Sequence, residues 1–317
     1  MAPRLIHSPA RAPRSKIERA VGRAGRHHGE ILQGLWWPRS PARADPVPCL
    51  VTLPVPDAGS EAHFRLAPGR QIEVHPAGKL KAASAARVAL DSLGAIAFGG
   101  VLRLRCPIPI GLGLGSSTSD VLATLRAVCA ACGRQADADM LARLAVRAEL
   151  ASDPLMFDGT VLFAQRDGRV LEHWGHWSPE FLLLSVDTQP RSRGRDTLRL
   201  PVPRGAAMLA NYTGLLQQAR AAFQAQDPAA IAAVATRSAE LHQSTIPMRG
   251  FDALRALRSA SGALGLQIAH SGTVAGLLFD PQIEPRTLEP LLGRIRSLGM
   301  ATLGFSRTGH YASPGSA

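Results

Sequence analysis

The sequence lacks long apolar runs. Although 46% of its 317 residues are hydrophobic, stretches such as Phe181–Val186 and Val274–Phe279 are far shorter than the roughly 20 residues of a membrane span. The basic N-terminus also lacks an apolar segment followed by a small-residue cleavage site, which argues against secretion. We therefore expect a soluble, cytoplasmic protein without a membrane partner.

Cysteine is scarce. The four cysteines, Cys49, Cys106, Cys129 and Cys132, do not have the dense, even spacing of a disulfide-stapled domain. The pair Cys129 and Cys132 has the spacing of some zinc and redox sites, but no second Cys or His pair lies nearby at ligand spacing. We expect both thiols to be buried in an apolar helix, in a reducing compartment.

Lysine is nearly absent, since the only lysines are Lys16, Lys79 and Lys81. A Walker phosphate loop needs Gly-Lys-Ser/Thr, and none of these lysines is followed by Ser or Thr. This absence excludes the nucleotide-binding proteins that depend on that loop.

Positive charge is concentrated at the N-terminus. Residues 1–28 hold seven basic residues against Glu18 alone, which is half of the net charge of +12. We expect residues 1–24 to form a basic, disordered tail. Such a tail could contact nucleic acid or an acidic partner, but we favour a solvated arm, while the remaining charge helps to attract a polyanion such as ATP.

The rest of the chain has the patterns of both helices and strands. Residues 25–56, rich in Gly, His and Pro, are expected to form loops or edge strands, whereas Val101–Arg105 alternates like a half-buried strand. Further helices are expected at about 137–150, 206–226, 228–243 and 251–262, and further strands within 160–174, 181–186, 267–279 and 301–305.

A glycine-rich segment, Pro107–Ser117, follows the first of these strands and opens into a helix. Its prolines forbid helix, and its glycines let backbone N–H groups converge on phosphate oxygens without obstruction by Cβ. The positive dipole end of the helix favours the same anion. Hydroxyls of Ser116, Ser117, Thr118 and Ser119 offer N-caps, phosphate donors or magnesium ligands. The segment therefore predicts binding of the phosphates of ATP.

Two other segments add to this loop. Gly29-Glu-Ile-Leu-Gln-Gly34 precedes it, and Ala269-His-Ser-Gly-Thr-Val-Ala-Gly-Leu-Leu278 follows it. Together with Leu114-Gly-Ser-Ser-Thr118, they resemble, in order, the three motifs of the galactokinase, homoserine kinase, mevalonate kinase and phosphomevalonate kinase (GHMP) superfamily. The first segment is most similar to that of propanediol-utilisation-type L-threonine kinases. The resemblance covers about residues 25–310.

This resemblance implies an α+β fold with two lobes. The N-terminal nucleotide-binding lobe would span residues 25–187, and a ferredoxin-like C-terminal lobe would span residues 188–317. ATP and Mg²⁺ are the implied cofactors. The residues expected to hold ATP are Pro107, Ile110, Gly111, Leu112, Gly113, Leu114, Gly115, Ser116, Ser117 and Thr118.

The resemblance also implies roles for acidic residues. Ser117 and Glu149 would ligate Mg²⁺, and Asp153 would face the acceptor hydroxyl as base or orienter. Asp158 is the rival carboxylate, and the residues leave that choice open. The acceptor pocket is expected to contain Glu30, Gln33, His270, Ser271 and Gly272.

The implied reaction is ATP-dependent phosphorylation of a small amino acid. L-threonine, as a step toward cobalamin, is the favoured acceptor, and Glu30 suits the ammonium of an amino acid. Homoserine or another amino alcohol is the alternative acceptor. A nucleotide sensor or a basic nucleic-acid-associated protein on the same fold is the non-enzymatic alternative. The oligomeric state, including a homodimer, stays open. His27 and His28 lack a third ligand, so no metal is expected on them.

Overall fold

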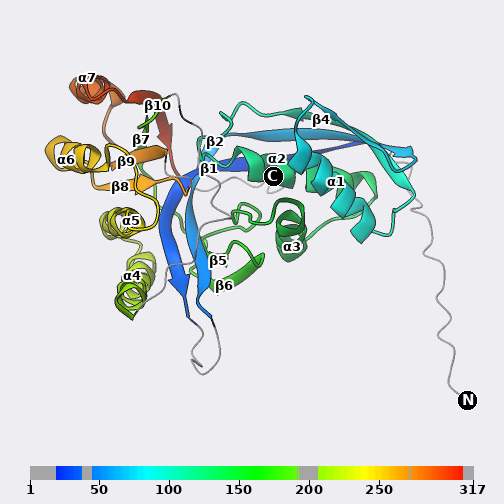
Figure 1. The fold of residues 1–317 in the computed structure, drawn as a ribbon, viewed down its shortest axis with the longest axis horizontal. Coiled ribbons are helices and arrows are strands. Elements are labelled where there is room, and N and C mark those ends of the chain that lie inside the picture. The colour runs from blue at the N-terminus through cyan, green and yellow to red at the C-terminus, as the bar shows by residue number, and fades with distance from the viewer. Residues whose placement is uncertain (1–18, 38–44, 191, 193–205, 271–272, 310–317) are drawn as a thin grey trace, which may run out of the picture.

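The computed structural model describes residues 19–37, 45–190, 192, 206–270 and 273–309 (Figure 1). Two long antiparallel strands, β1 (Arg19–Trp36) and β2 (Val47–Pro68), run through the middle of the molecule. They join the N-terminal and C-terminal halves in one sheet, whose main strand order is β10-β7-β9-β8-β1-β2-β4-β3. No helix of the described residues is long and apolar enough to cross a membrane.

The course of β1 and β2 corrects two expectations. Residues 19–24, assigned to the tail, form the start of β1, whereas residues 1–18 lie outside the described part. Much of residues 25–56 forms inner strands rather than loops or edge strands, because side chains such as Ile31 and Leu53 are buried between layers. Pro54 is tolerated because it lies opposite His27, where the register of the two strands shifts.

The N-terminal half packs three helices against the sheet. These are α1 (Leu80–Ser92), α2 (Ser116–Ala131) and α3 (Ala138–Glu149), and β3 (Ile72–His75) and β4 (Phe98–Arg105) extend the sheet beyond β2. Their shared core includes Phe64, Leu102 and Leu125. Cys129 and Cys132 are buried there as free thiols, as expected. The hairpin of β5 (Val161–Ala164) and β6 (Arg169–His173) pairs with β2.

The C-terminal half contains the rest of the sheet and four further α-helices of the described chain. Its strands are β7 (Leu182–Asp187), β8 (Gly265–Ile268), β9 (Val274–Phe279) and β10 (Ala301–Arg307). Its helices are α4 (Ala206–Gln224), α5 (Pro228–His242), α6 (Phe251–Ser261) and α7 (Glu289–Ser297), with a 3₁₀ turn, η2, at Pro285–Leu288. Although β7 precedes residue 188, it pairs with β9 and β10 in this half.

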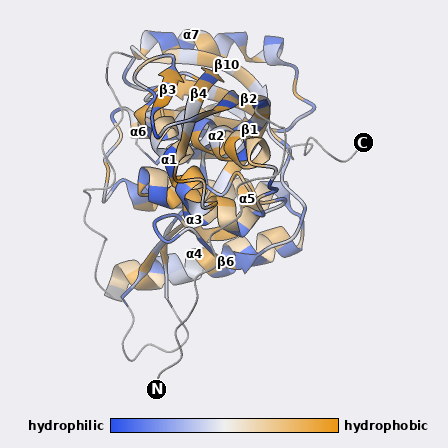
Figure 2. Cartoon of the chain, turned by 90° about the vertical axis from the view of Figure 1, so that its right-hand side faces the viewer, coloured by the Kyte–Doolittle hydropathy of each residue, from blue (hydrophilic) through white to orange (hydrophobic). Residues whose placement is uncertain are grey.

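Most of the expected elements are present, and the fold is α+β as expected. Helices α1 and α7 and strand β3 were not anticipated. In Figure 2 hydrophobic segments gather where helices and sheet pack together, and hydrophilic segments lie toward the outside. This packing fixes β1, the loop before α2 and the end of α3 beside one another.

Candidate active site

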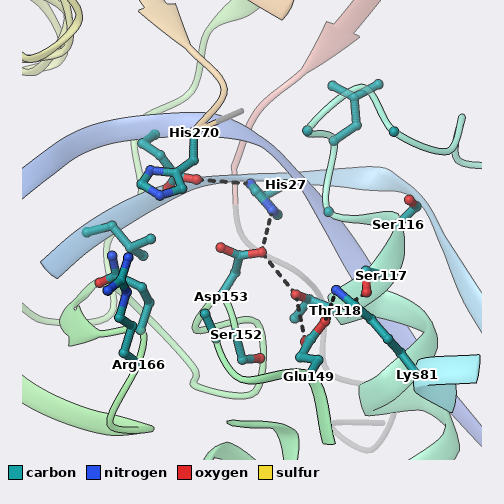
Figure 3. Close-up of a pocket in the computed structure, with 18 residues that line it drawn as sticks. His27, Lys81, Ser116, Ser117, Thr118, Glu149, Ser152, Asp153, Arg166 and His270 are labelled. Atoms are coloured by element: carbon teal, nitrogen blue, oxygen red, sulfur yellow. Dashed lines mark hydrogen bonds and ion pairs between the residues drawn. The ribbon is translucent and has the colours of Figure 1, made fainter. Parts of the chain in front are cut away.

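A pocket of about 240 Å³ lies where β1, the glycine-rich loop and the turn after α3 meet (Figure 3). From the loop and the start of α2 it is lined by Gly111, Gly113, Leu114, Gly115, Ser116, Ser117 and Thr118. The other lining residues are His27, Glu30, Leu50, Lys81, Glu149, Ala151, Ser152, Asp153, Gln165, Arg166 and His270. Pro107, Ile110 and Leu112, which were expected to hold ATP, are outside this lining.

The start of α2 differs in one respect from the expectation. Its N-cap is Gly115, with no side-chain capping bond, so the hydroxyls that follow do not cap the helix. Ser117 Oγ instead donates a hydrogen bond to Glu149 Oε2 over 2.7 Å. The hydroxyl of Thr118 lies 3.1 Å from Glu149 Oε1 and 3.0 Å from Asp153 Oδ2.

Gly115 is required by both its backbone and its neighbour. Its φ of +76° lies in the left-handed region that side chains disfavour. A Cβ there would lie 2.2 Å from His27 Cδ2. The glycine therefore lets the imidazole ring pack directly against the helix start.

Glu149 is the last residue of α3 and is only 4% exposed. Burial raises the pKa of its carboxyl, while the hydrogen bond from Ser117 and the charge of Lys81 oppose that rise. Lys81 Nζ lies 3.5 Å from Glu149 Oε2. A hydroxyl and a buried carboxylate that already meet in one place are the hard oxygen donors that suit Mg²⁺.

Asp153, in the turn after α3, forms an ion pair with His27. His27 Nε2 lies 2.9 Å from Asp153 Oδ2, and the imidazole is almost fully buried. Burial alone would lower the pKa of His27, but the charge and hydrogen bond of Asp153, helped by Glu30, raise it to about 9. Burial would raise the pKa of Asp153, but His27 and the hydrogen bond from Thr118 hold it below its ordinary value.

The surroundings of His27 correct the expectation that it lacks further groups at ligand distance. Ligand atoms of His27, Glu30 and Asp153 all lie within 4.8 Å of one another. In this arrangement His27 Nε2 makes a hydrogen bond and an ion pair with Asp153. His28 is buried away from this pocket and contacts Gln267.

Glu30 is a buried carboxylate without hydrogen-bond partners. It is 1% exposed, and neither of its carboxylate oxygens accepts a hydrogen bond from the described residues. Burial raises its pKa well above the ordinary value, although the charge of His27 opposes the rise. A break in the register of β1 at Gly29, with φ of +56°, lets both His27 and Glu30 reach the pocket.

The remaining acceptor residues have mixed positions. His270 lines the pocket, and its Nδ1 donates to Gln33 Oε1 over 2.8 Å, so Gln33 stands behind it. Ser271 and Gly272 lie outside the described residues. Asp158, the rival to Asp153, is not part of the pocket lining.

Lys81 and Arg166 were not predicted from the sequence to belong to the site, and His27 was not assigned a role in it. Lys81 comes from the first turn of α1, and the run of alanines after it is a helix signal that could have placed it. Arg166 comes from the turn between β5 and β6. Neither residue lies near the motifs in sequence, so only the fold brings them to the pocket.

The fold and the glycine-rich loop of this chain can be compared with those of known protein families. Residues 80–157 match the family described as GHMP kinases N terminal domain. The homoserine kinase structure from Cytophaga hutchinsonii superposes with a TM-score of 0.64 at 17% identity, covering 94% of this chain and 97% of that one. The chain thus has the two-lobed α+β fold of the GHMP kinase superfamily, and the expected resemblance is confirmed.

Among curated proteins, the chain is similar to two L-threonine kinases. It is 33% identical over 181 residues to that of Salmonella typhimurium (strain LT2), which is 56% of this chain and 59% of the relative. It is 33% identical over 177 residues to that of Citrobacter freundii, which is 55% of this chain and 60% of the relative. The match therefore spans about three fifths of the length of either relative.

Proposed function

We propose that this protein transfers the γ-phosphoryl group of ATP to the side-chain hydroxyl of L-threonine, forming O-phospho-L-threonine. One observation carries the proposal. A single pocket is lined by a phosphate-type loop, by Asp153 and by the buried carboxylate of Glu30, which accepts no hydrogen bond from the described residues and has His27 Nδ1 at 3.8 Å. The loop suits a polyphosphate, and Glu30 suits the ammonium group of an amino acid.

The phosphate end would bind ATP through backbone N–H groups of the loop and the N-terminus of α2. Lys81 adds a positive charge beside Glu149. Ser117 and Glu149 would hold Mg²⁺, which when bound neutralises charge on the phosphates. Much of the rate acceleration would come from holding the reacting groups in place.

The acceptor end would bind the amino acid through Glu30. An ammonium group would donate to both of its carboxylate oxygens and would repay the desolvation of that carboxylate. His270 and the Gln33 behind it would form the adjoining wall. Gly272 and Ser271 stay predictions for the same wall.

Asp153 would take the hydroxyl proton. As that proton moves to the carboxylate, the threonine oxygen bonds to the γ-phosphorus, and the bond from the γ-phosphorus to the β–γ bridging oxygen breaks to release ADP. The ion pair with His27 keeps Asp153 in the ionised form that can accept a proton.

The names of the curated relatives favour threonine over other acceptors. A pathway toward cobalamin, a cytoplasmic location and a homodimeric assembly are part of the proposal on the strength of the resemblance alone. Homoserine is the alternative acceptor, and the homoserine kinase similarity supports it only through the fold.

The test is ADP release with a panel of acceptors, namely L-threonine, L-serine, L-homoserine, 1-amino-2-propanol, galactose and mevalonate. We expect L-threonine to have the highest kcat/KM, because a pocket that fits its methyl group gains about 1–3 kcal/mol over L-serine, which is about 5- to 150-fold. Mass spectrometry should identify O-phospho-L-threonine. Equal or better use of homoserine would assign the alternative acceptor, and ATP binding without turnover on any acceptor would indicate a nucleotide sensor.

A further inference from the structure

Two donors approach one oxygen of Asp153. His27 Nε2 lies 2.9 Å from Asp153 Oδ2, and Thr118 Oγ1 lies 3.0 Å from the same atom. Oδ1 receives no hydrogen bond from the part of the chain that the structure describes. Figure 3 shows this second oxygen turned away from both donors, toward the side of the pocket where Arg166 and His270 lie. The carboxylate is therefore held by one oxygen and open at the other.

The surroundings of Thr118 distinguish it from its neighbours. Its side chain is buried, with 4% of the residue exposed, whereas Ser116 and Ser117 are half-buried. A β-branched side chain within a helix has few χ1 choices, so the direction of its hydroxyl is well defined. The hydroxyl of Thr118 thus lies against the carboxylates of Glu149 and Asp153.

Thr118 has one hydroxyl proton for two carboxylate contacts, so it can donate to only one of them at a time. The other two groups that approach Glu149, Ser117 Oγ and Lys81 Nζ, lie at Oε2, whereas Thr118 contacts Oε1. Among the described residues, Asp153 Oδ2 has His27 as its other donor. The contact with Asp153 Oδ2 is the shorter of the two, 3.0 Å against 3.1 Å, and we assign the proton of Thr118 to it.

We propose that Thr118 is a positioning residue that, with His27, fixes Oδ2 of Asp153 and so presents Oδ1 to the hydroxyl of the acceptor. The proposal rests on the kinase function argued above. In the transfer step the acceptor proton goes to Oδ1, the acceptor oxygen bonds to the γ-phosphorus, and ADP leaves. Thr118 itself neither gains nor loses a proton. The rival role for Thr118 is the one expected from the sequence, direct binding of ATP.

The two roles separate in the variant Thr118→Val, which keeps the shape and removes the hydroxyl. A positioning residue predicts a fall in kcat of about 10- to 100-fold, the effect of losing a hydrogen bond to a charged group. The Kd for ATP, measured by calorimetry, should change by less than about twofold because no phosphate contact is lost. A raised Kd for ATP with kcat unchanged would instead make Thr118 a phosphate ligand and overturn the proposal.

Two further variants complete the test. Thr118→Ser keeps the hydroxyl and should return kcat to within about threefold of the unaltered protein, whereas Thr118→Ala should resemble Thr118→Val. This serine-to-alanine comparison carries the test if the valine variant does not fold. In the Asp153→Asn background, removing the Thr118 hydroxyl should have little further effect on kcat, because the two residues act as one unit. Additive losses would overturn the proposal.

Crystal structures of the ligand-free protein and of Thr118→Val give a readout that does not depend on turnover. We expect the Asp153 carboxylate in one orientation in the former and in more than one orientation in the latter. An unchanged single orientation in Thr118→Val would refute the positioning role even if the kinase function holds. Conversely, absence of turnover on every acceptor would refute the kinase function while these structures still test Thr118.

Discussion

Replacement of Glu30 by glutamine should make the protein more stable and less able to bind its acceptor. The folded protein buries this carboxyl without a hydrogen-bond partner and raises its pKa well above the ordinary value of 4.5. The folded state therefore holds a proton that the unfolded chain releases as pH rises. Stability falls with pH in the window above the ordinary pKa and below the raised one.

The size of the stability difference follows from this pH window between the ordinary and the raised pKa of Glu30. Each pH unit within it costs the native protein about 1.4 kcal/mol of unfolding free energy, and Glu30→Gln, which has no proton to retain, escapes this cost. The stability difference between Glu30→Gln and the native protein should therefore grow with pH by up to about 1.4 kcal/mol per unit. An amide also costs less to bury than an ionised carboxylate.

Whereas stability should increase in Glu30→Gln, its affinity for the acceptor should decrease. Loss of one partner from a buried charge pair costs about 2–5 kcal/mol, so KM for L-threonine should rise by about 30- to 5,000-fold. The KM for ATP should stay within about twofold, because Glu30 is assigned to the other end of the pocket.

The assay combines urea denaturation at pH 5, 6 and 7 with ADP release at saturating ATP and varied L-threonine. Glu180, exposed just before β7, provides the matched control Glu180→Gln, which should change neither quantity appreciably. An unchanged KM for threonine, together with a stability difference that does not grow with pH, would refute the reasoning about Glu30.

Three further predictions concern the phosphate loop and the two carboxylates. Ser117→Ala and Glu149→Gln should each reduce turnover strongly at saturating magnesium, because each removes an oxygen donor from the proposed cation site; near-normal rates for both would contradict that site. Asp153→Asn should lower kcat by about 10²- to 10⁴-fold with ATP binding little changed, whereas Asp158→Asn, outside the pocket lining, should stay active; the reverse result would transfer the role to Asp158. Gly115→Ala should lower the unfolding free energy by at least about 1 kcal/mol, because its φ of +76° disfavours a side chain; calorimetric melting without a loss of stability would contradict this.

The phosphate loop was predictable because its chemistry is local. The prolines between residues 107 and 118 indicate where the chain cannot be helical, and the glycines indicate where its backbone can approach an anion. The hydroxyl residues indicate where the next helix begins. Most helices and strands were also predictable, because the periodic spacing of apolar residues that identifies each of them lies within one contiguous segment. Helix α1 was missed because its alanine-rich sequence has only a weak apolar pattern.

Long-range pairing was not predictable in this way. Residues 25–56 contain turn-forming glycines and prolines, yet they form inner strands because β8 pairs with β1 at Glu30 and β5 pairs with β2 at Leu50. Their burial depends on neighbours more than a hundred residues away as well as on their own composition.

The sequence by itself determined the phosphate loop, the helix behind it and the resemblance that directed attention to Glu149 and Asp153. Only the tertiary structure decided that His27 pairs with Asp153, because that contact joins residues 126 positions apart. It also decided that Glu30 is buried beside His27 without accepting a hydrogen bond from the described residues. The charge state of a side chain depends on its solvation and on nearby charges, and both are set by the packing of distant segments.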